Sequence, residues 1–552
     1  MSSISDISDT QHLLSPSSSL ECDTQDMEWE KKKPSRRKGY IRFSRRDVIA
    51  LSKQLLHNFT IRPLGLRRKS PVTSLRKRIV VAFLNSIVAT IAFLIFFSIA
   101  NAILFPSYAN PPAHYGNLAT NVIAGDKPGR GNPRGEKIFI AANIIQADLI
   151  KGVWGENLVK LIELLGEENV FVSIYENDSG EASRRALREL AGKLKCPFSI
   201  ITGAHLPLSD FPSVVLPNGN HRVKRLTYLS HLRNELLRPL DPPPNNLSHG
   251  PLQINYTNTR FNRILFLNDI YYNPVDALQL LFSTNQDQFS HRAEYDVACA
   301  IDFVASVMFY DTFVVRDTEG YSMGLMFFPW FTQKSSATSR NDVLAEKDAV
   351  RVKSCWGGMA AYNAAPFLRQ PNNNTALRFR HQGELYWEAS ECCLLNADIA
   401  TREPDAKVFI NPYVRVAYDT KTWGRLPLMR RFEKVFSILQ YVVSGIGYPE
   451  TNPRRMERGG EVSRQKRWVY WNESLNGEGM RDQRSTVEKG ELGGEWEWTE
   501  EVAQPGGFCG MRRLFVMKGD DIGEANRKVE SSGRNWEKGP WPEKKVRRGF
   551  GV

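Results

Sequence analysis

Two polar residues, Asn268 and Asp269, directly follow an apolar run at residues 264–267. Four consecutive apolar residues are typical of a strand buried on both faces of a helix-covered parallel sheet. Ligand sites in such sheets lie just beyond the carboxyl ends of the strands. A carboxylate at that edge can hold a divalent cation, and the cation can neutralise a diphosphate. Asp269, with Asn268 beside it, is therefore the candidate metal ligand, and a buried strand capped by an Asx turn is the alternative.

Three further acidic residues are candidates for catalysis. Asp302 follows the apolar pair at residues 300–301, near the end of a predicted strand. There it would be a second metal or sugar ligand, or a cap of the next element. Glu388 and Glu391 lie three residues apart, so at helical spacing they share a face. One of them, with Glu391 preferred, could accept the proton of an attacking hydroxyl group.

Arginines recur along a predicted helix over residues 222–237. Arg222 and Arg225 are three residues apart and close enough to face one ligand, and guanidinium groups suit phosphate oxygens. Arg233 is a further candidate for such a contact. The alternative is that these arginines line a solvated helix face.

The elements that would position these residues alternate between strand and helix, which indicates an α/β fold with a largely parallel sheet. We expect the ordered domain to extend over residues 137–445. We expect residues 446–552 to be loosely ordered except around residues 508–510, because they are rich in Gly, Glu, Arg and Trp with little periodicity. The expected strands are residues 138–142, 170–175, 198–201 and 264–267, and the expected helices include residues 158–165, 182–194, 222–237 and 275–281.

The net charge of +13 is concentrated near the N-terminus. Residues 1–30 contain seven acidic residues and no Lys or Arg, whereas residues 31–78 contain 17 Lys and Arg and one acid. The remaining residues sum to about +4. Because the basic residues form one block outside the predicted domain, nucleic-acid binding loses most of its support.

Residues 79–105 form a 27-residue stretch without a charge, ended by Pro106. About 20 apolar residues span a bilayer, so this stretch predicts a single transmembrane signal-anchor helix, with a buried helix of a soluble protein as the alternative. The Lys and Arg residues that precede it predict that residues 1–78 form a disordered cytosolic tail and that the rest is lumenal. The Pro- and Gly-rich residues 106–136 then predict a stem.

The cysteines and sequons fit a lumenal domain. Six of the seven cysteines follow the apolar stretch, where disulfides are allowed. Their spacings match no zinc site, and their connectivity stays open. Any exposed sequon could be glycosylated. The sequons begin at Asn177, Asn246, Asn255, Asn373 and Asn472.

Eight motifs dense in acids, aromatics and cysteine lie in order between residues 137 and 420. They are residues 173–179, 232–236, 295–303, 310–317, 354–359, 377–380, 387–393 and 410–412. As an ordered set they resemble the fungal capsule-associated α-1,3-mannosyltransferases, glycosyltransferase family 69. The resemblance implies a GT-A-like nucleotide-sugar transferase fold and transfer of mannose from GDP-mannose to a mannose-containing glycan with retention. It also implies Mn2+ or another divalent cation, and a single-pass type II protein of the Golgi membrane.

Site roles follow from the resemblance together with the residue chemistry. Asp269 and Asn268 would hold the metal, and Glu391, Glu388 and Asp302 would be catalytic. The donor would contact Arg233, Asn234, Glu176, Arg225 and Trp356.

Two positions depart from the family pattern. Gly357 stands where Asn usually follows the Trp, and Asn396 stands where relatives commonly have His. These departures keep open an alternative, a catalytically impaired paralogue that serves as a scaffold in a complex with other glycosyltransferases.

Overall fold

The computed structural model describes residues 75–241, 260–305, 308–323, 327–328, 331–368, 375–447, 452–471, 493–518 and 536–539. The predicted tail up to residue 74 lies outside the described residues, as do the sequons at Asn246, Asn255, Asn373 and Asn472. The chain divides near residue 101 into a smaller unit and a larger one that holds the domain.

Helix α2 (Leu75–Leu104) contains the predicted apolar stretch. Its residues Ile79–Leu104 have a mean hydropathy of 2.6, and no part of that stretch is buried. In length and composition it is the one described helix that could cross a membrane. This agrees with the single membrane helix predicted from the sequence.

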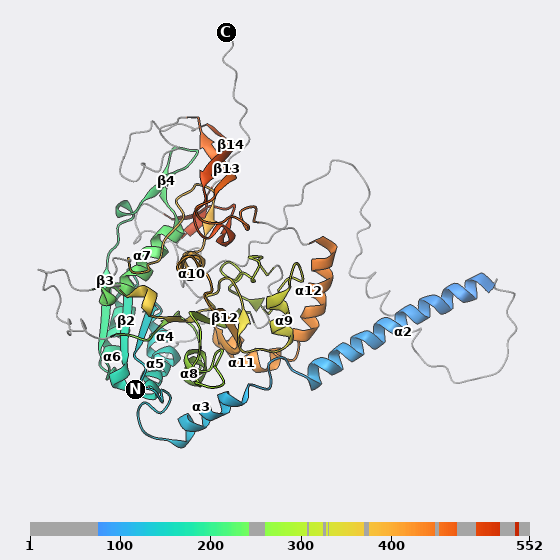
Figure 1. The fold of residues 1–552 in the computed structure, drawn as a ribbon, viewed down its shortest axis with the longest axis horizontal. Coiled ribbons are helices and arrows are strands. Elements are labelled where there is room, and N and C mark those ends of the chain that lie inside the picture. Colours follow the sequence, from blue (N-terminus) through green and yellow to red (C-terminus); the bar gives the residue numbers. More distant parts are fainter. Residues whose placement is uncertain are drawn as a thin grey trace, which may run out of the picture. The chain divides into compact units, whose positions relative to one another are not determined.

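The larger unit is built around a mixed, mostly parallel sheet (Figure 1). Strands β3, β2, β1 and β6 run parallel, β10 lies antiparallel between β6 and β7, and β7 runs parallel to β12. The α/β fold with a mostly parallel central sheet that the sequence predicts is therefore confirmed. In sheet order the strands are β3 (Phe198–Ala204), β2 (Val170–Asn177), β1 (Ile138–Asn143), β6 (Arg263–Leu267), β10 (Met359–Asn363), β7 (Val297–Val304), β12 (Val408–Ala417) and β9 (Val350–Arg351), with β8 (Met308–Phe309) beside β7.

Two apolar clusters, one on each face of the sheet, explain the continuous apolar run of β6. Ile264 and Phe266 belong to one cluster, and Leu265 and Leu267 belong to the other. Side chains of a strand alternate between faces, so a strand covered on both sides needs no polar residue.

The described helices of this unit are α3 (Ala113–Ala124), α4 (Ala147–Lys151), α5 (Val153–Leu165), α6 (Glu181–Ala191), α7 (Arg225–Leu237), α8 (Pro274–Phe282), α9 (Thr338–Leu344), α10 (Glu391–Arg402), α11 (Thr420–Met429) and α12 (Glu433–Gly447).

The helix predicted over residues 222–237 is shorter in the structure. It begins at Arg225, while Arg222 lies in β5 (His221–Val223), which pairs with β4 (Ser213–Val215). Arg222 forms an ion pair with Glu537 at 2.8 Å. The two arginines therefore do not share a helix face.

Residues 106–136 differ from the predicted stem because they pack into the domain. Tyr108 is fully buried, and its ring centroid lies 4.8 Å from that of Tyr413. Helix α3 buries Tyr115 and Leu118. Aromatic and aliphatic side chains thus tie this segment down despite its Pro and Gly content.

The described parts of residues 446–552 contain strands, which differs from the expected loose order. Strands β13 (Val462–Tyr470) and β14 (Gly494–Val502) pair antiparallel along their full lengths, and the Tyr470 hydroxyl donates to the Val215 carbonyl oxygen. In Figure 1 this hairpin lies beside β4. Further pairs join β15 (Gly510–Met511) to β11 (Glu388–Ala389), and β16 (Phe515–Met517) to β17 (Trp536–Lys538).

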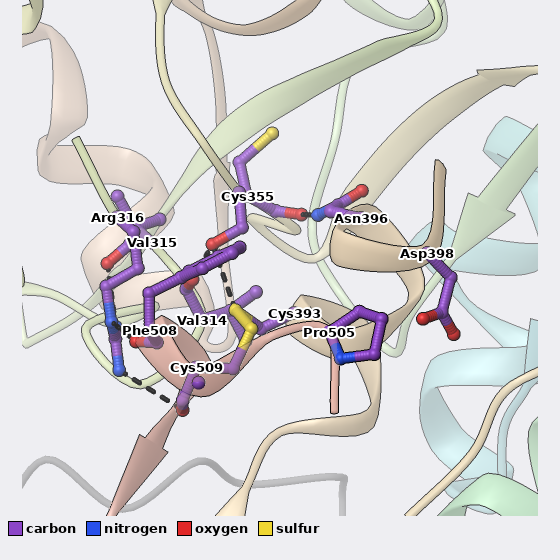
Figure 2. The surroundings of a disulfide bond; sticks show 12 residues. Val314, Val315, Arg316, Cys355, Cys393, Asn396, Asp398, Pro505, Phe508 and Cys509 are labelled. Carbon is purple, nitrogen blue, oxygen red and sulfur yellow. Dashed lines mark hydrogen bonds between the residues drawn. A yellow bond between two sulfur atoms is a disulfide. The ribbon is translucent and has the colours of Figure 1, made fainter. Parts of the chain in front are cut away.

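Two disulfides fix the cysteine connectivity that the sequence left open. One joins Cys299 in β7 to Cys355, and the other joins Cys393 in α10 to Cys509 across 116 residues of chain. Figure 2 shows the second, with Arg316 beside it. The Arg316 Nε donates to the Phe508 carbonyl oxygen at 2.9 Å. The C-terminal region is thus covalently tied to the helix that carries Glu391.

Replacing Cys393 and Cys509 together with Ser is expected to lower the free energy of unfolding by roughly 2–5 kcal/mol, because the bond restrains a long loop of the unfolded chain. Thermal unfolding of the full-length protein, followed by tryptophan fluorescence, measures the effect. The free and buried Cys196, replaced by Ala, is the matched control. Equal melting temperatures for the two variants would contradict the expectation.

Candidate functional site

The Asn268-Asp269 pair lies at the carboxyl end of β6, at the edge where the loop before β10 returns to the sheet. The Asn268 N–H donates to the Gly358 carbonyl oxygen at 2.9 Å. The Trp154 Nε1 donates to the Asn268 carbonyl oxygen at 2.9 Å. Both bonds fix the backbone of Asn268, so the buried Asp269 is held at the sheet edge where ligands of α/β folds bind.

The loop before β10 depends on two glycines in the left-handed region. Gly357 has a φ of +59° and Gly358 a φ of +66°. A Cβ at Gly357 would lie 1.9 Å from the Ala300 carbonyl oxygen. Asn tolerates a positive φ better than most residues, but at position 357 the Ala300 carbonyl oxygen leaves no room for its Cβ. The departure from the family pattern at Gly357 therefore has a steric cause in this chain.

A buried acidic pair supports that loop. Asp302 Oδ1 accepts from the Asp311 N–H at 3.1 Å, and its Oδ2 accepts from the Tyr418 hydroxyl at 2.9 Å. Asp311 Oδ2 accepts from the N–H groups of Trp356 and Gly357 at 3.0 and 2.9 Å. Asp302, predicted as a catalytic residue, thus sits in a hydrogen-bond network that positions the loop. Asp311 was not identified from the sequence, because its partners are backbone groups.

Burial raises the pKa of both carboxyls. For Asp302 burial is the main cause, and for Asp311 the charge of Asp302 adds to burial. Burial and the Asp302 charge also raise the pKa of the neighbouring Tyr418 hydroxyl. A carboxyl whose pKa is higher in the folded state stabilises the fold while it is protonated and loses that contribution as the pH rises through the folded pKa.

The free energy of unfolding is therefore expected to fall as the pH rises from about 4 toward neutral, by up to about 1.4 kcal/mol per pH unit for one proton. Asp302→Asn removes one titrating group while keeping the shape of the side chain, so its unfolding free energy should fall less steeply. Urea unfolding at a series of pH values measures both slopes. Identical slopes in the two proteins would contradict the assignment.

Arg233 and Glu391 form a buried ion pair beside this loop. The Arg233 Nε lies 2.9 Å from Glu391 Oε1, and both side chains are almost fully buried. The Arg233 guanidinium lies 4.3 Å from the ring centroid of Trp356. The Trp356 Nε1 donates to Asn268 Oδ1 at 3.4 Å. The structure therefore brings together Arg233, Trp356, Glu391 and the Asn268-Asp269 pair.

Glu388 belongs to a different cluster. The prediction that Glu388 and Glu391 share one helix face was wrong. Glu388 lies in β11, whereas Glu391 is the first residue of α10. Glu388 lies 3.4 Å from the buried Lys224 ammonium and accepts from the Phe515 N–H at 3.1 Å. Burial raises its pKa to about 7. The contact with Phe515 ties β11 to the C-terminal region.

Three predicted donor-binding residues have contacts within the protein. Glu176 accepts from the N–H groups of Ser179 and Gly203, both at 2.8 Å. Asn234 exchanges two hydrogen bonds with the backbone of Phe379. The Arg225 guanidinium lies 4.9 Å from the ring centroid of Trp536. The structure does not bring these three to the Asn268-Asp269 pair through any of these contacts.

Two asparagines that the sequence singled out are buried and hydrogen-bonded. Asn177, in the one described sequon, donates to the Tyr228 hydroxyl at 2.6 Å. Asn396 donates to the Cys355 carbonyl oxygen at 2.8 Å and accepts from the Tyr362 hydroxyl at 3.3 Å (Figure 2 draws the first bond). In this fold Asn396 therefore supports the Cys355 loop, and Asn177 is not exposed for glycosylation.

The donor set at the sheet edge restricts how a cation would bind. Within the described ranges no three His, Cys, Asp or Glu side chains lie close enough together to hold a metal ion. Among the described residues Asp269 would then be one of at most two such ligands, with other oxygens coming from phosphates and water. Mg2+-like cations are commonly bound in this way, through one or two carboxylates and substrate phosphates. The residues fit a cation that arrives with a diphosphate.

Comparison with solved structures returns distant likenesses. The mannosyltransferase PcManGT from Pyrobaculum calidifontis, in complex with GDP-Man and Mn2+, is 11% identical with a TM-score of 0.28, over 65% of this chain and 75% of that chain. Glucosyl-3-phosphoglycerate synthase from Mycobacterium tuberculosis, in complex with Mn2+, UDP and phosphoglyceric acid, is 10% identical with a TM-score of 0.28, over 73% and 95%. No curated protein matches the chain.

Comparison with protein families gives a direct result. Residues 137–398 match the family described as Cryptococcal mannosyltransferase 1. The match begins at the predicted start of the domain and includes Asp269, Arg233, Trp356 and Glu391. Residues 137–398 of the chain are therefore similar to the cryptococcal mannosyltransferases.

Proposed function

We propose that this protein transfers mannose from GDP-mannose to a mannose-containing glycan, with retention and an α-1,3 linkage. The match of residues 137–398 to a mannosyltransferase family supports the transfer of mannose. The observation that carries the assignment of the site is the position of Asp269. It is buried at the carboxyl end of β6, next to the loop of Trp356 and the Arg233–Glu391 pair.

The proposed roles follow from the contacts. Asp269 would hold a divalent cation, Mn2+ or a similar ion, which when bound neutralises the charge of the diphosphate. Asn268 places Asp269 through its backbone bonds, and its side-chain oxygen accepts from Trp356. Glu391 would accept the proton of the acceptor hydroxyl, and Arg233 orients Glu391 through the ion pair.

We also propose that α2 anchors the protein as a type II protein of the Golgi membrane, with the domain in the lumen. The basic block before the apolar stretch supports this orientation. The two disulfides support an oxidising compartment.

An inactive scaffold for other glycosyltransferases is the second candidate function. It is favoured by Asn396, which stands where relatives commonly have His and whose side chain bonds within the protein. Under this candidate the purified protein would bind partner enzymes but would not consume any nucleotide sugar.

A screen of nucleotide sugars with the full-length protein in detergent tests the proposal. The expected result is release of GDP from GDP-mannose in the presence of Mn2+, with at most about a tenth of that rate for UDP-glucose, a difference of about 1.4 kcal/mol in the barrier. Release of nucleotide from another donor alone would overturn the choice of donor. No release from any donor would favour the scaffold.

A further inference from the structure

Helix α12 is attached to the domain mainly through polar side chains. Glu433 forms a buried ion pair with Arg415, and Gln440 donates to the Met323 carbonyl oxygen at 2.8 Å. Between them Phe436 stacks on Phe327, with ring centroids 4.5 Å apart. Positions 433, 436 and 440 form one stripe of a helix, so this stripe is the inner face of α12.

The opposite surface of α12 is apolar and exposed. Ile438, Leu439, Tyr441 and Val442 are 56%, 45%, 57% and 48% exposed. In a domain surrounded by water, a helix normally turns its apolar stripe inward. A contiguous exposed apolar surface marks a contact with another apolar phase or partner.

The position of α12 indicates which apolar phase or partner its exposed surface contacts. Arg431, two residues before the helix, donates through its Nη1 to the Ile103 carbonyl oxygen at 2.5 Å. Its neighbour Arg430 accepts from the Ser107 N–H at 3.1 Å. Ile103 is the penultimate residue of the apolar stretch Ile79–Leu104. Helix α12 therefore starts beside the end of the only described helix that could cross a membrane.

We propose that the exposed face of α12 lies in the interfacial layer of the bilayer that α2 crosses. A helix with an apolar face can bury it at the boundary between headgroups and acyl chains, and tyrosine is favoured at that depth. No spacer separates the span from the domain, because Ser107 and Tyr108 are already buried in it. Two elements of the chain, α2 and α12, would then contact the membrane (Figure 1 labels both).

This inference rests on the membrane anchoring in the proposed function, so the test includes a label on α2. The full-length chain is used in lipid nanodiscs, with Cys22 replaced by Ser, and the described free cysteines, Cys196 and Cys392, are buried. A polarity-sensitive fluorophore is attached to a cysteine introduced at Leu439 or, in a second variant, at Ile438. The same label at Ile91 reports on α2, and at Val462 in β13, which is 71% exposed, it is the matched control.

The expected result is that lipids carrying a nitroxide on the acyl chain quench the labels at Leu439, Ile438 and Ile91 by roughly twofold or more, while aqueous iodide quenches only the label at Val462. Quenching of Leu439 and Ile438 by iodide alone would overturn the inference, because the face would be open to water. Protection of both labels from both quenchers would also overturn it and would indicate a covering protein. If the label at Ile91 escaped the nitroxide lipids, the membrane anchoring itself would fail.

Discussion

Asp269→Ala is expected to lower the rate of GDP release from GDP-mannose by about a thousandfold or more, equivalent to about 4 kcal/mol of transition-state stabilisation. The reason is that Asp269 is the carboxylate that the end of β6 offers to a cation at this edge. Initial rates at saturating Mn2+ measure the effect. The fold should persist, because Asp269 follows the strand and is not one of its paired residues.

The matched control for this prediction is Asp398→Asn. Asp398 also lies in the domain, but its carboxylate pairs with Arg380 at 2.8 Å and has no proposed role in the site. Its rate should stay within about threefold of the wild type, less than 1 kcal/mol. A normal rate in Asp269→Ala, with a correct melting temperature, would remove Asp269 from the site.

Arg233→Met is expected to destabilise the protein by roughly 3–5 kcal/mol, because it leaves the carboxylate of Glu391 buried without its cation. The double variant Arg233→Met and Glu391→Leu removes both charges, so much of this stability should return. Melting temperatures and urea midpoints of the two variants and of Glu391→Leu complete the thermodynamic cycle.

Activity measurements distinguish a structural role of the Arg233–Glu391 pair from a catalytic one. If Glu391 accepts the acceptor proton, the double variant should be stable but should lose mannosyl transfer. Recovery of both stability and transfer in the double variant would show that the pair only holds α10 against α7. The proposed role of Glu391 would then be withdrawn.

The sheet was predictable where the signal was local. The apolar run at residues 264–267 correctly predicted β6, because all its side chains meet apolar clusters. The position of β10 between β6 and β7 was not predictable, since pairing partners distant in sequence leave no local pattern. That insertion brings Gly358 beside Asn268 and completes the site.

Two errors have identifiable physical causes. Ser390 separates the last residue of β11 from α10, so a spacing of three between Glu388 and Glu391 does not place them on one helix face. In β14, Glu and Trp alternate through Trp496 and Trp498, a period of two that indicates a strand. The sequence thus contained a signal for that strand, which the high charge obscured.

Contacts of buried polar groups could not be read from the sequence. Arg233 sits in a helix whose residues alone suggest a solvated face, yet it is buried against Trp356 and Glu391. Likewise the role of Asp311 depends on two backbone N–H groups contributed by a loop 45 residues away. Such roles follow from tertiary structure, because residue type and spacing do not determine which distant backbone groups a side chain meets.

The central claim is that the protein moves mannose from GDP-mannose to a mannose-containing acceptor. The most direct measurement incubates the full-length protein with GDP-mannose, Mn2+ and an α-mannoside, and analyses the products by mass and linkage. The expected result is an acceptor extended by one α-1,3-linked mannose, formed by the wild type and not by Asp269→Ala. Absence of any extended acceptor and of GDP release, from correctly folded protein with Mn2+ or Mg2+, would contradict the claim.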